Sequence, residues 1–338
     1  MQRIQLGNAV FEGKNDVYLL GDGSDDTVLI DTGVATPESR DQLRAGLAEY
    51  DRTFGDVDAI LLTHWHHDHV GLAGEIQRES DATVYVHEAD AAMVETDETG
   101  HEAEIEARNL FDRWGVPDEK AAELLDFLDG HDDLRGPAPT VQPIRDGERF
   151  EFGDVALEAV HLPGHAAGLA GFAFDGDDGC ELFAGDALLP HYTPNVGGAD
   201  PRVEDPLGAY LDSLERIVER DFARAWPGHR DPIADPRARA REIMNHHRER
   251  TERVLAVLRE QGPADPWTVS AELFGELSNI HIMHGPGEAW AHLEHLARCG
   301  VVTAVESEYE LDDPNPDLDE LFDYRSEPDA ASVSDRSR

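Results

Sequence analysis

The stretch that most constrains this chain is LLTHWHHDHVGL, residues 61–72, in which four histidines and one aspartate fall within six positions. It ends an apolar run typical of a buried strand. His64 and His66 are two residues apart, so they share one face where the strand ends. Asp68 and His69 follow in a turn before a glycine-led helix. A histidine-rich surface loop is the alternative, but imidazoles and a carboxylate in this pattern favour a Zn²⁺ or Fe²⁺ site.

Short apolar runs and helical patterns alternate around this stretch. Two β runs joined by a Gly/Asp turn occur in NDVYLLGDGSDDTVLIDTG (residues 15–33), which predicts a hairpin. Residues 88–135 are mostly helical in pattern and very acidic, so they form an insertion before the strand pattern resumes. The later strand-like runs are ERFEFGDVALEAVHLPGH (148–165), AGFAFDG (170–176), CELFAGD (180–186) and ARAWPGH (223–229).

The pattern changes to helical after residue 236. Helices are predicted over 237–262, 268–277 and 287–299, and VVTAVESEYEL (301–311) predicts a small β wing, an arrangement that resembles a winged helix. The Asp/Pro/Ser-rich end of the chain predicts a disordered acidic tail. The predicted domains are 1–236, 237–310 and 311–338.

Apolar positions in the last helix and the wing predict how this C-terminal unit is packed. We expect them to contact the first domain or a second subunit. The second case would make a homodimer through the C-terminal unit. These positions are Leu293, Leu296, Val301 and Val302.

Four further motifs accompany the histidine-rich stretch: one precedes it in the chain and three follow it. They are LIDTG (29–33), HLPGHAAG (161–168), FAGDAL (183–188) and WPGHRDPI (226–233). Together with H-x-H-x-D-H they resemble the metallo-β-lactamase superfamily over about residues 10 to 235. This resemblance implies an α/β fold, an αββα four-layer sandwich, and a metal-dependent hydrolase.

The resemblance also implies a ligand set for two divalent metal ions, most simply Zn²⁺, with Fe or Mn as alternatives. Two such ions share a hydroxide that acts as the nucleophile, and Asp68 would help to orient it. Asp31 would hydrogen-bond near the ligands, although a plain Asp-Thr-Gly turn is the alternative. The implied first-metal ligands are His64, His66 and His165; the implied second-metal ligands are Asp68, His69 and His229; Asp186 would bridge both.

The loop GDALLPHYTPNVGG, residues 185–198, follows the implied bridging aspartate and should border the metals. His191 and Tyr192 in this loop are therefore candidate substrate contacts, with loop packing as the alternative. The insertion at 88–135 would cover the site as a lid. His161 is expected to be packed or hydrogen-bonded, and the histidines of the C-terminal unit show no second ligand cluster.

Fold and metals do not specify the substrate, so several functions stay open. The first is hydrolysis of a small thioester or related ester, as in hydroxyacylglutathione hydrolases. The second is an endoribonuclease or phosphodiesterase, because residues 237–260 hold seven arginines against four glutamates. The acidic composition does not favour nucleic acid as a partner. A mononuclear iron persulfide dioxygenase and a non-enzymatic binding protein are further alternatives.

Composition indicates where such a chain works. The formal net charge is −44, and Lys14 and Lys120 are the two lysines among its 338 residues. This pattern resembles the salt-adapted proteins of haloarchaea. No apolar run approaches the roughly 20 residues of a membrane span, and Cys180 and Cys299 lie far apart in the sequence, so we expect a cytoplasmic protein without a disulfide framework.

We predict that the fold depends on salt, because the spread-out negative charge repels itself and molar salt shortens the screening length to about 3 Å. Circular dichroism melts in dilute buffer and in molar KCl would measure this. The melting temperature should be much higher in KCl. Identical cooperative unfolding in both buffers would rule out the hypothesis that the protein is adapted to high salt.

Overall fold

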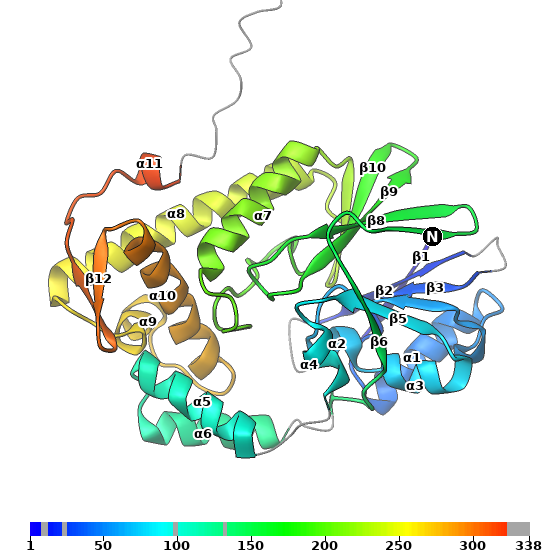
Figure 1. The fold of residues 1–338 in the computed structure, drawn as a ribbon, viewed down its shortest axis with the longest axis horizontal. Helices are drawn as coiled ribbons and strands as arrows, with labels where there is room; N and C mark the ends of the chain where they lie inside the picture. The colour runs from blue at the N-terminus through cyan, green and yellow to red at the C-terminus, as the bar shows by residue number, and fades with distance from the viewer. Residues whose placement is uncertain (8–12, 22–25, 97–100, 131–133, 323–338) are drawn as a thin grey trace, which may run out of the picture.

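The computed structural model describes residues 1–7, 13–21, 26–96, 101–130 and 134–322. Two β sheets lie face to face, with helices on their outer sides (Figure 1). The first sheet contains, in spatial order, β1 (Gln2–Leu6), β2 (Asn15–Leu20), β3 (Val28–Ile30), β4 (Ala59–Leu61), β5 (Thr83–His87) and β6 (Val141–Ile144). The second has the order β11 (Arg224–Pro227), β10 (Gly179–Gly185), β9 (Ala170–Gly176), β8 (Val155–His161) and β7 (Arg149–Phe152).

The alternation of side chains along the strands creates the layers. In the parallel pair β3 and β4, Ile30 lies beside Leu61. Both point into the core between the sheets, where they meet Phe172 and Phe183 of the second sheet. Their neighbours Leu29 and Ile60 point to the opposite face and pack under the outer helices. The result is the αββα sandwich that the motif order predicted.

The outer helices begin at similar sequence signals. The first sheet is covered by α1 (Pro37–Ala48) and α3 (Ala73–Ser80), and the second by α7 (Pro206–Arg220) and the start of α8 (Pro236–Gln261). Three of these helices, α1, α7 and α8, start with proline directly after a Thr or Asp whose side chain accepts a backbone N–H of the first turn. The cap satisfies an open donor, and proline costs nothing where no donor is needed.

The C-terminal unit contains α8, α9 (Pro266–Phe274), α10 (His281–Arg298), the hairpin β12 (Val302–Val305) and β13 (Glu308–Leu311), and α11 (Leu318–Leu321). The predicted order of helices followed by a hairpin is found, and the winged-helix assignment stays a prediction. The predicted start of α10 at residue 287 was wrong. Pro286 and its flanking glycines weaken the helical signal, but the helix runs through them from His281.

The acidic insertion packs against the C-terminal unit. It contains α4 (Ala91–Glu95), which packs on the first sheet, and α5 (His101–Trp114) and α6 (Asp118–Asp129), which lie beside α9 and α10 (Figure 1). Trp114 is fully buried, and its ring centroid lies 5.7 Å from that of Trp290 in α10. The two helices therefore complete a hydrophobic core that also contains Leu124 and Val254.

The expected contact of the C-terminal unit with the first domain is found in this core, and the homodimer stays a prediction. Four apolar positions of the last helix and the wing are buried there together with side chains of the acidic insertion, which belongs to the predicted first domain. They are Leu293, Leu296, Val301 and Val302.

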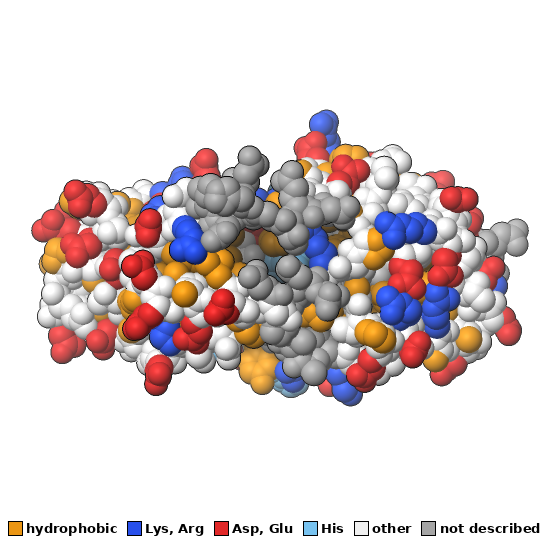
Figure 2. Space-filling model, turned by 90° about the horizontal axis from the view of Figure 1, so that it is seen from below, with side chains coloured by type: hydrophobic (Ala, Val, Ile, Leu, Met, Phe, Trp, Pro, Cys, Tyr) orange, Lys and Arg blue, Asp and Glu red, His pale blue; other side chains and the backbone are white. Residues whose placement is uncertain are grey.

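Within the described residues, no helix is both long and apolar enough for a bilayer span. Acidic side chains lie over both halves of the face in Figure 2.

Replacing Leu124 by Ala should destabilise the protein by about 2–5 kcal/mol, because it empties a fully buried position where α6 meets the C-terminal unit. Leu128→Ala is the matched control: it lies one turn later in the same helix and is 36% exposed, so it should cost less than about 1 kcal/mol. Urea unfolding in molar salt would measure both. Equal losses would contradict this packing.

Candidate metal centre

Each of the five motifs lies just beyond the end of a strand. Asp31 follows β3, and the histidine-rich stretch follows β4 and includes the short helix α2 (His67–Val70). His165 comes four residues after β8, Asp186 directly after β10, and His229 two residues after β11. The loops therefore come from both sheets, and the structure brings their side chains together at one edge of the sandwich.

Three histidines form the first group. His66 Nδ1 lies 2.9 Å from His64 Nε2 and 3.1 Å from His165 Nε2. Burial lowers the pKa of His64 well below its usual value, and burial together with His165 lowers that of His66 to about 3. These rings are therefore neutral, the form that can donate a lone pair to a metal.

Hydrogen bonds on the far side of each ring decide which nitrogen faces the group. His165 Nδ1 lies 2.8 Å from the backbone oxygen of Asn195, and His66 Nε2 lies 3.1 Å from that of Ala199. A carbonyl only accepts, so each of these ring nitrogens carries the proton. The nitrogens with lone pairs are left facing one another, as metal-ligating histidines require.

Asp68, His69 and His229 form the second group, and Asp186 lies between the two groups. His229 Nε2 is 3.3 Å from Asp68 Oδ2 and 3.4 Å from Asp186 Oδ2. Asp186 Oδ1 is 3.6 Å from His69 Nε2, while its Oδ2 is 3.7 Å from His165 Nε2. A carboxylate this close to histidines of both groups has the position expected of a bridging ligand.

Several buried ligand atoms of both groups lack a hydrogen-bond partner, which is what a pair of divalent metals would require. His69 Nε2, His229 Nε2 and Asp186 Oδ1 are buried and make no hydrogen bond to described residues. Buried polar atoms without partners are costly and rare, unless they face an ion or ligand. Burial alone would raise the pKa of Asp186, but His229 and His69 hold it well below its usual value, so the carboxylate is ionised. Histidines and carboxylates are suitable ligands for Zn²⁺, Fe²⁺ or Mn²⁺.

Asp31 is more than a turn residue. Its backbone is left-handed (φ 58°), which aims its buried carboxylate along the loop after β4. Oδ1 accepts the Thr63 N–H at 2.7 Å, and Oδ2 accepts the Thr63 hydroxyl and His69 Nδ1, each at 2.8 Å. Asp31 therefore orients the His69 ring so that Nε2 faces Asp186.

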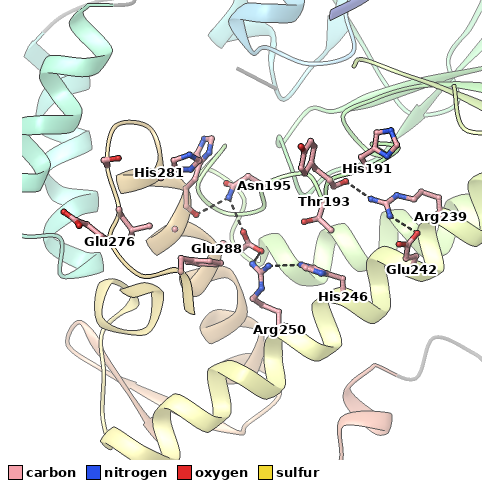
Figure 3. Close-up of a pocket in the computed structure, with 16 residues that line it drawn as sticks. His191, Thr193, Asn195, Arg239, Glu242, His246, Arg250, Glu276, His281 and Glu288 are labelled. Atoms are coloured by element: carbon pink, nitrogen blue, oxygen red, sulfur yellow. Dashed lines mark hydrogen bonds and ion pairs between the residues drawn. The ribbon is translucent and has the colours of Figure 1, made fainter. Parts of the chain in front are cut away.

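The loop after Asp186 borders a cavity of about 720 Å³ between that loop, α8 and the segment joining α9 to α10 (Figure 3). His191 and Tyr192 are both exposed and line it. The ring of Tyr192 lies under the Arg230 guanidinium, 4.8 Å away, and its backbone oxygen accepts from Arg239. Contacts with Arg230 and Arg239 thus fix the loop, while the side chains of His191 and Tyr192 stay accessible.

Both arginines that line the cavity are already paired. Arg239 forms an ion pair with Glu242 at 2.8 Å, and Arg250 pairs with Glu288 and contacts His246 (Figure 3). Burial, followed by Arg250, lowers the pKa of His246, so this ring is neutral as well. The described lining thus offers a bound group hydrogen bonds and aromatic surface and no unpaired arginine.

Some site residues carried no sequence signal. Asn15, in strand β2, donates from Nδ2 to Asp68 Oδ2 at 3.3 Å, although its sequence neighbours show no motif. Gly228 of the W-P-G-H motif is needed for space: a Cβ there would lie 2.5 Å from His69 Cε1 and 2.6 Å from Asp186 Oδ1. Larger residues at that position would push the ligands apart.

The remaining histidines are placed outside the centre. His161 Nε2 donates to the Ala167 backbone oxygen at 2.9 Å and the ring stacks on His87, so His161 is packed and hydrogen-bonded as predicted. The expectation of no second ligand cluster in the C-terminal unit was wrong. Sequence reasoning missed the cluster of His247, Glu288 and His292, because two of its members are hidden 41 or more residues after the first.

Most polar side-chain atoms of that second cluster have partners within the chain, although His247 Nε2 is buried without a hydrogen bond to described residues. The two rings bond to each other at 3.3 Å, the His292 Nδ1 bonds the Thr251 hydroxyl at 2.7 Å, and Glu288 pairs with Arg250. A guanidinium already neutralises the single carboxylate, which disfavours a divalent cation there.

The fold and the buried His/Asp clusters define a metallo-hydrolase. Residues 10–229 match the model of the metallo-beta-lactamase superfamily, and the chain belongs to that family. The metallo-beta-lactamase family protein TTHA1429 of Thermus thermophilus is similar at 33% identity and a TM-score of 0.78, covering 92% of this chain and 98% of that one.

Two curated relatives are more distant. The "Probable metallo-hydrolase YqjP" of Bacillus subtilis is 26% identical, over 85% of this chain and 89% of its own length. The "Atrochrysone carboxyl ACP thioesterase" of Emericella nidulans is 27% identical over 75% of this chain, and this chain spans only 63% of that protein.

Replacing Asp31 by Asn should reduce turnover by roughly 10–100-fold, because the amide cannot hold His69 and Thr63 as the carboxylate does. Steady-state kinetics and the metal content of the purified variant would show it. Asp51→Asn is the control, since Asp51 has the same left-handed backbone (φ 56°) but is exposed. A fully active, fully metallated Asp31 variant would contradict the orienting role.

Proposed function

We propose that the protein is a dinuclear metal-dependent hydrolase acting on a small thioester or related ester. The observation that carries the proposal is the convergence of buried ligand groups on Asp186. The cavity is one residue away: Asn195, which lines it, accepts from His165. His64, His66 and His165 would hold one metal, and Asp68, His69 and His229 the other, with Asp186 shared. Divalent metals bound there would polarise a carbonyl oxygen and make water acidic enough to act as a nucleophile near neutral pH.

The chain's own residues do the positioning. Asp68 faces His229 at 3.3 Å and receives the Asn15 amide on the same oxygen. Its carboxylate stays ionised because His69 and His229 outweigh the effect of burial and keep its pKa below its usual value. It would therefore orient the attacking water by accepting one of its protons in a hydrogen bond.

The cavity beside the centre supports an acyl substrate. Tyr192 and Phe274 are among the large apolar side chains that stay exposed, at 53% and 37%, and both line the cavity. They would contact an apolar or aromatic acyl group, while His191 lies at the loop that leads from Asp186. A relative whose name records an ACP thioesterase supports the same bond type.

The nuclease alternative loses its main support. At least six of the seven arginines between residues 237 and 260 are bonded inside the chain, to carboxylates or backbone oxygens, so they do not form a free phosphate-binding surface. They are Arg237, Arg239, Arg248, Arg250, Arg253 and Arg259. A persulfide dioxygenase remains the second candidate, since it would use a subset of the same ligands.

The test combines elemental analysis with a panel of thioesters, lactones, phosphodiesters and β-lactams, on protein purified in molar salt. We expect about two metals per chain and turnover of thioesters. Asp186→Asn should lower turnover by at least 100-fold, because it removes the charge shared by both groups. One iron per chain with oxygen consumption on a persulfide would indicate the dioxygenase, and no stoichiometric metal would refute the proposal.

A further inference from the structure

The two carbonyl groups that fix the first-group histidines belong to one short loop. Asn195 O accepts from His165 Nδ1 at 2.8 Å, and Ala199 O accepts from His66 Nε2 at 3.1 Å. Any shift of residues 195–199 would turn both rings, because each ring follows its carbonyl partner. Contacts that fix residues 195–199 therefore also fix the orientation of His66 and His165.

The loop lies directly on the first half of α10, backbone against backbone. A Cβ on Gly287 would lie 2.2 Å from Gly198 Cα, and a Cβ on Gly198 would lie 2.7 Å from His284 Cα. A Cβ on Gly197 would lie 2.4 Å from Gly287 O. Such contacts are possible only with glycine on both sides, so the loop and the helix form a close seam, residues 195–199 against 284–287.

Polar contacts fix the same seam at its edge. Asn195 Nδ2 donates to the His284 oxygen at 3.1 Å and lies 3.5 Å from Glu288 Oε2 (Figure 3). Glu288 pairs with Arg250 of α8, and these side chains are only 12% and 11% exposed. Removing either partner would leave a largely buried charge, so the pair resists movement of the loop.

We infer that α10 is a positioning element of the metal centre: through the glycine seam and the Glu288–Arg250 pair, it holds the loop that sets the tautomer and direction of His66 and His165. The inference rests on the proposed metal binding and goes beyond it. It gives the C-terminal unit a role in the reaction of the first domain, and neither nucleic-acid binding nor dimerisation is needed to explain its presence.

The test is Gly287→Ala, with Gly285→Ala as its matched control. Both put the same methyl group into the same helix, two residues apart. At Gly287 the methyl group meets loop backbone, whereas at Gly285 its nearest contacts are the movable ends of the Leu277 side chain. The measurement is metal retained per chain during chelator titration, with circular dichroism in the same buffer.

We expect wild type and Gly285→Ala to retain two metals, and Gly287→Ala to lose one of them at a chelator concentration at least tenfold lower. If Gly287→Ala does not fold, Glu288→Gln decides, because it keeps the shape and removes the charge; it should shift retention in the same direction. A folded Gly287→Ala that retains both metals like wild type overturns the inference, as does an unshifted Glu288→Gln where that variant decides. Wild type without metal would instead overturn the proposed function.

Discussion

The structure depends on keeping carboxylates and imidazoles together where water is almost excluded. Asp31, Asp68 and Asp186 are buried within one small region, and each ionised carboxylate there must be balanced by nearby positive charge or strong hydrogen bonds. The balancing groups come from loops on both sheets. The αββα sandwich suits this need because its strands deliver the loops to one edge and its three cores hold the strands in register.

Support for the centre extends beyond the sandwich. Four of the implied ligands are held by a hydrogen bond from outside the centre: His69 by Asp31, Asp68 by Asn15, and His165 and His66 by backbone oxygens of residues 195–199. The last of these depends on α10, which in turn shares a hydrophobic core with the acidic insertion. Insertion, C-terminal unit and metal centre are thus mechanically linked, although they are separate in sequence.

The parts of this arrangement that are local in sequence could be predicted. The H-x-H-x-D-H run, the strand ends around it and the proline-capped helices each depend on a few neighbouring residues. The roles of Asn15, Gly287 and Glu288 could not be predicted, because the site residues that they contact are distant in the sequence and nothing nearby marks them. Those residues are Asp68, Gly198 and Asn195. Pro286 misled the helix prediction, since proline normally argues against a helix interior. Periodicity predicted the apolar face of the last helix, but it could not show that the acidic insertion is the part of the first domain that covers this face.

The shared centre leaves specificity to the cavity. Superfamily members use one fold for many reactions, so the ligands cannot distinguish one substrate from another. The cavity walls come from the loop after Asp186, from α8, from the segment between α9 and α10, and from the first half of α10. Its arginines are neutralised by Glu242 and Glu288, so an anionic group would have to break an existing pair to bind them. At the high ionic strength that the composition predicts, exposed charges are screened within a few ångströms. For the proposed ester hydrolase, recognition in this cavity would then rest on shape, aromatic contact and short hydrogen bonds, and an uncharged acyl group would be the part of the substrate that enters.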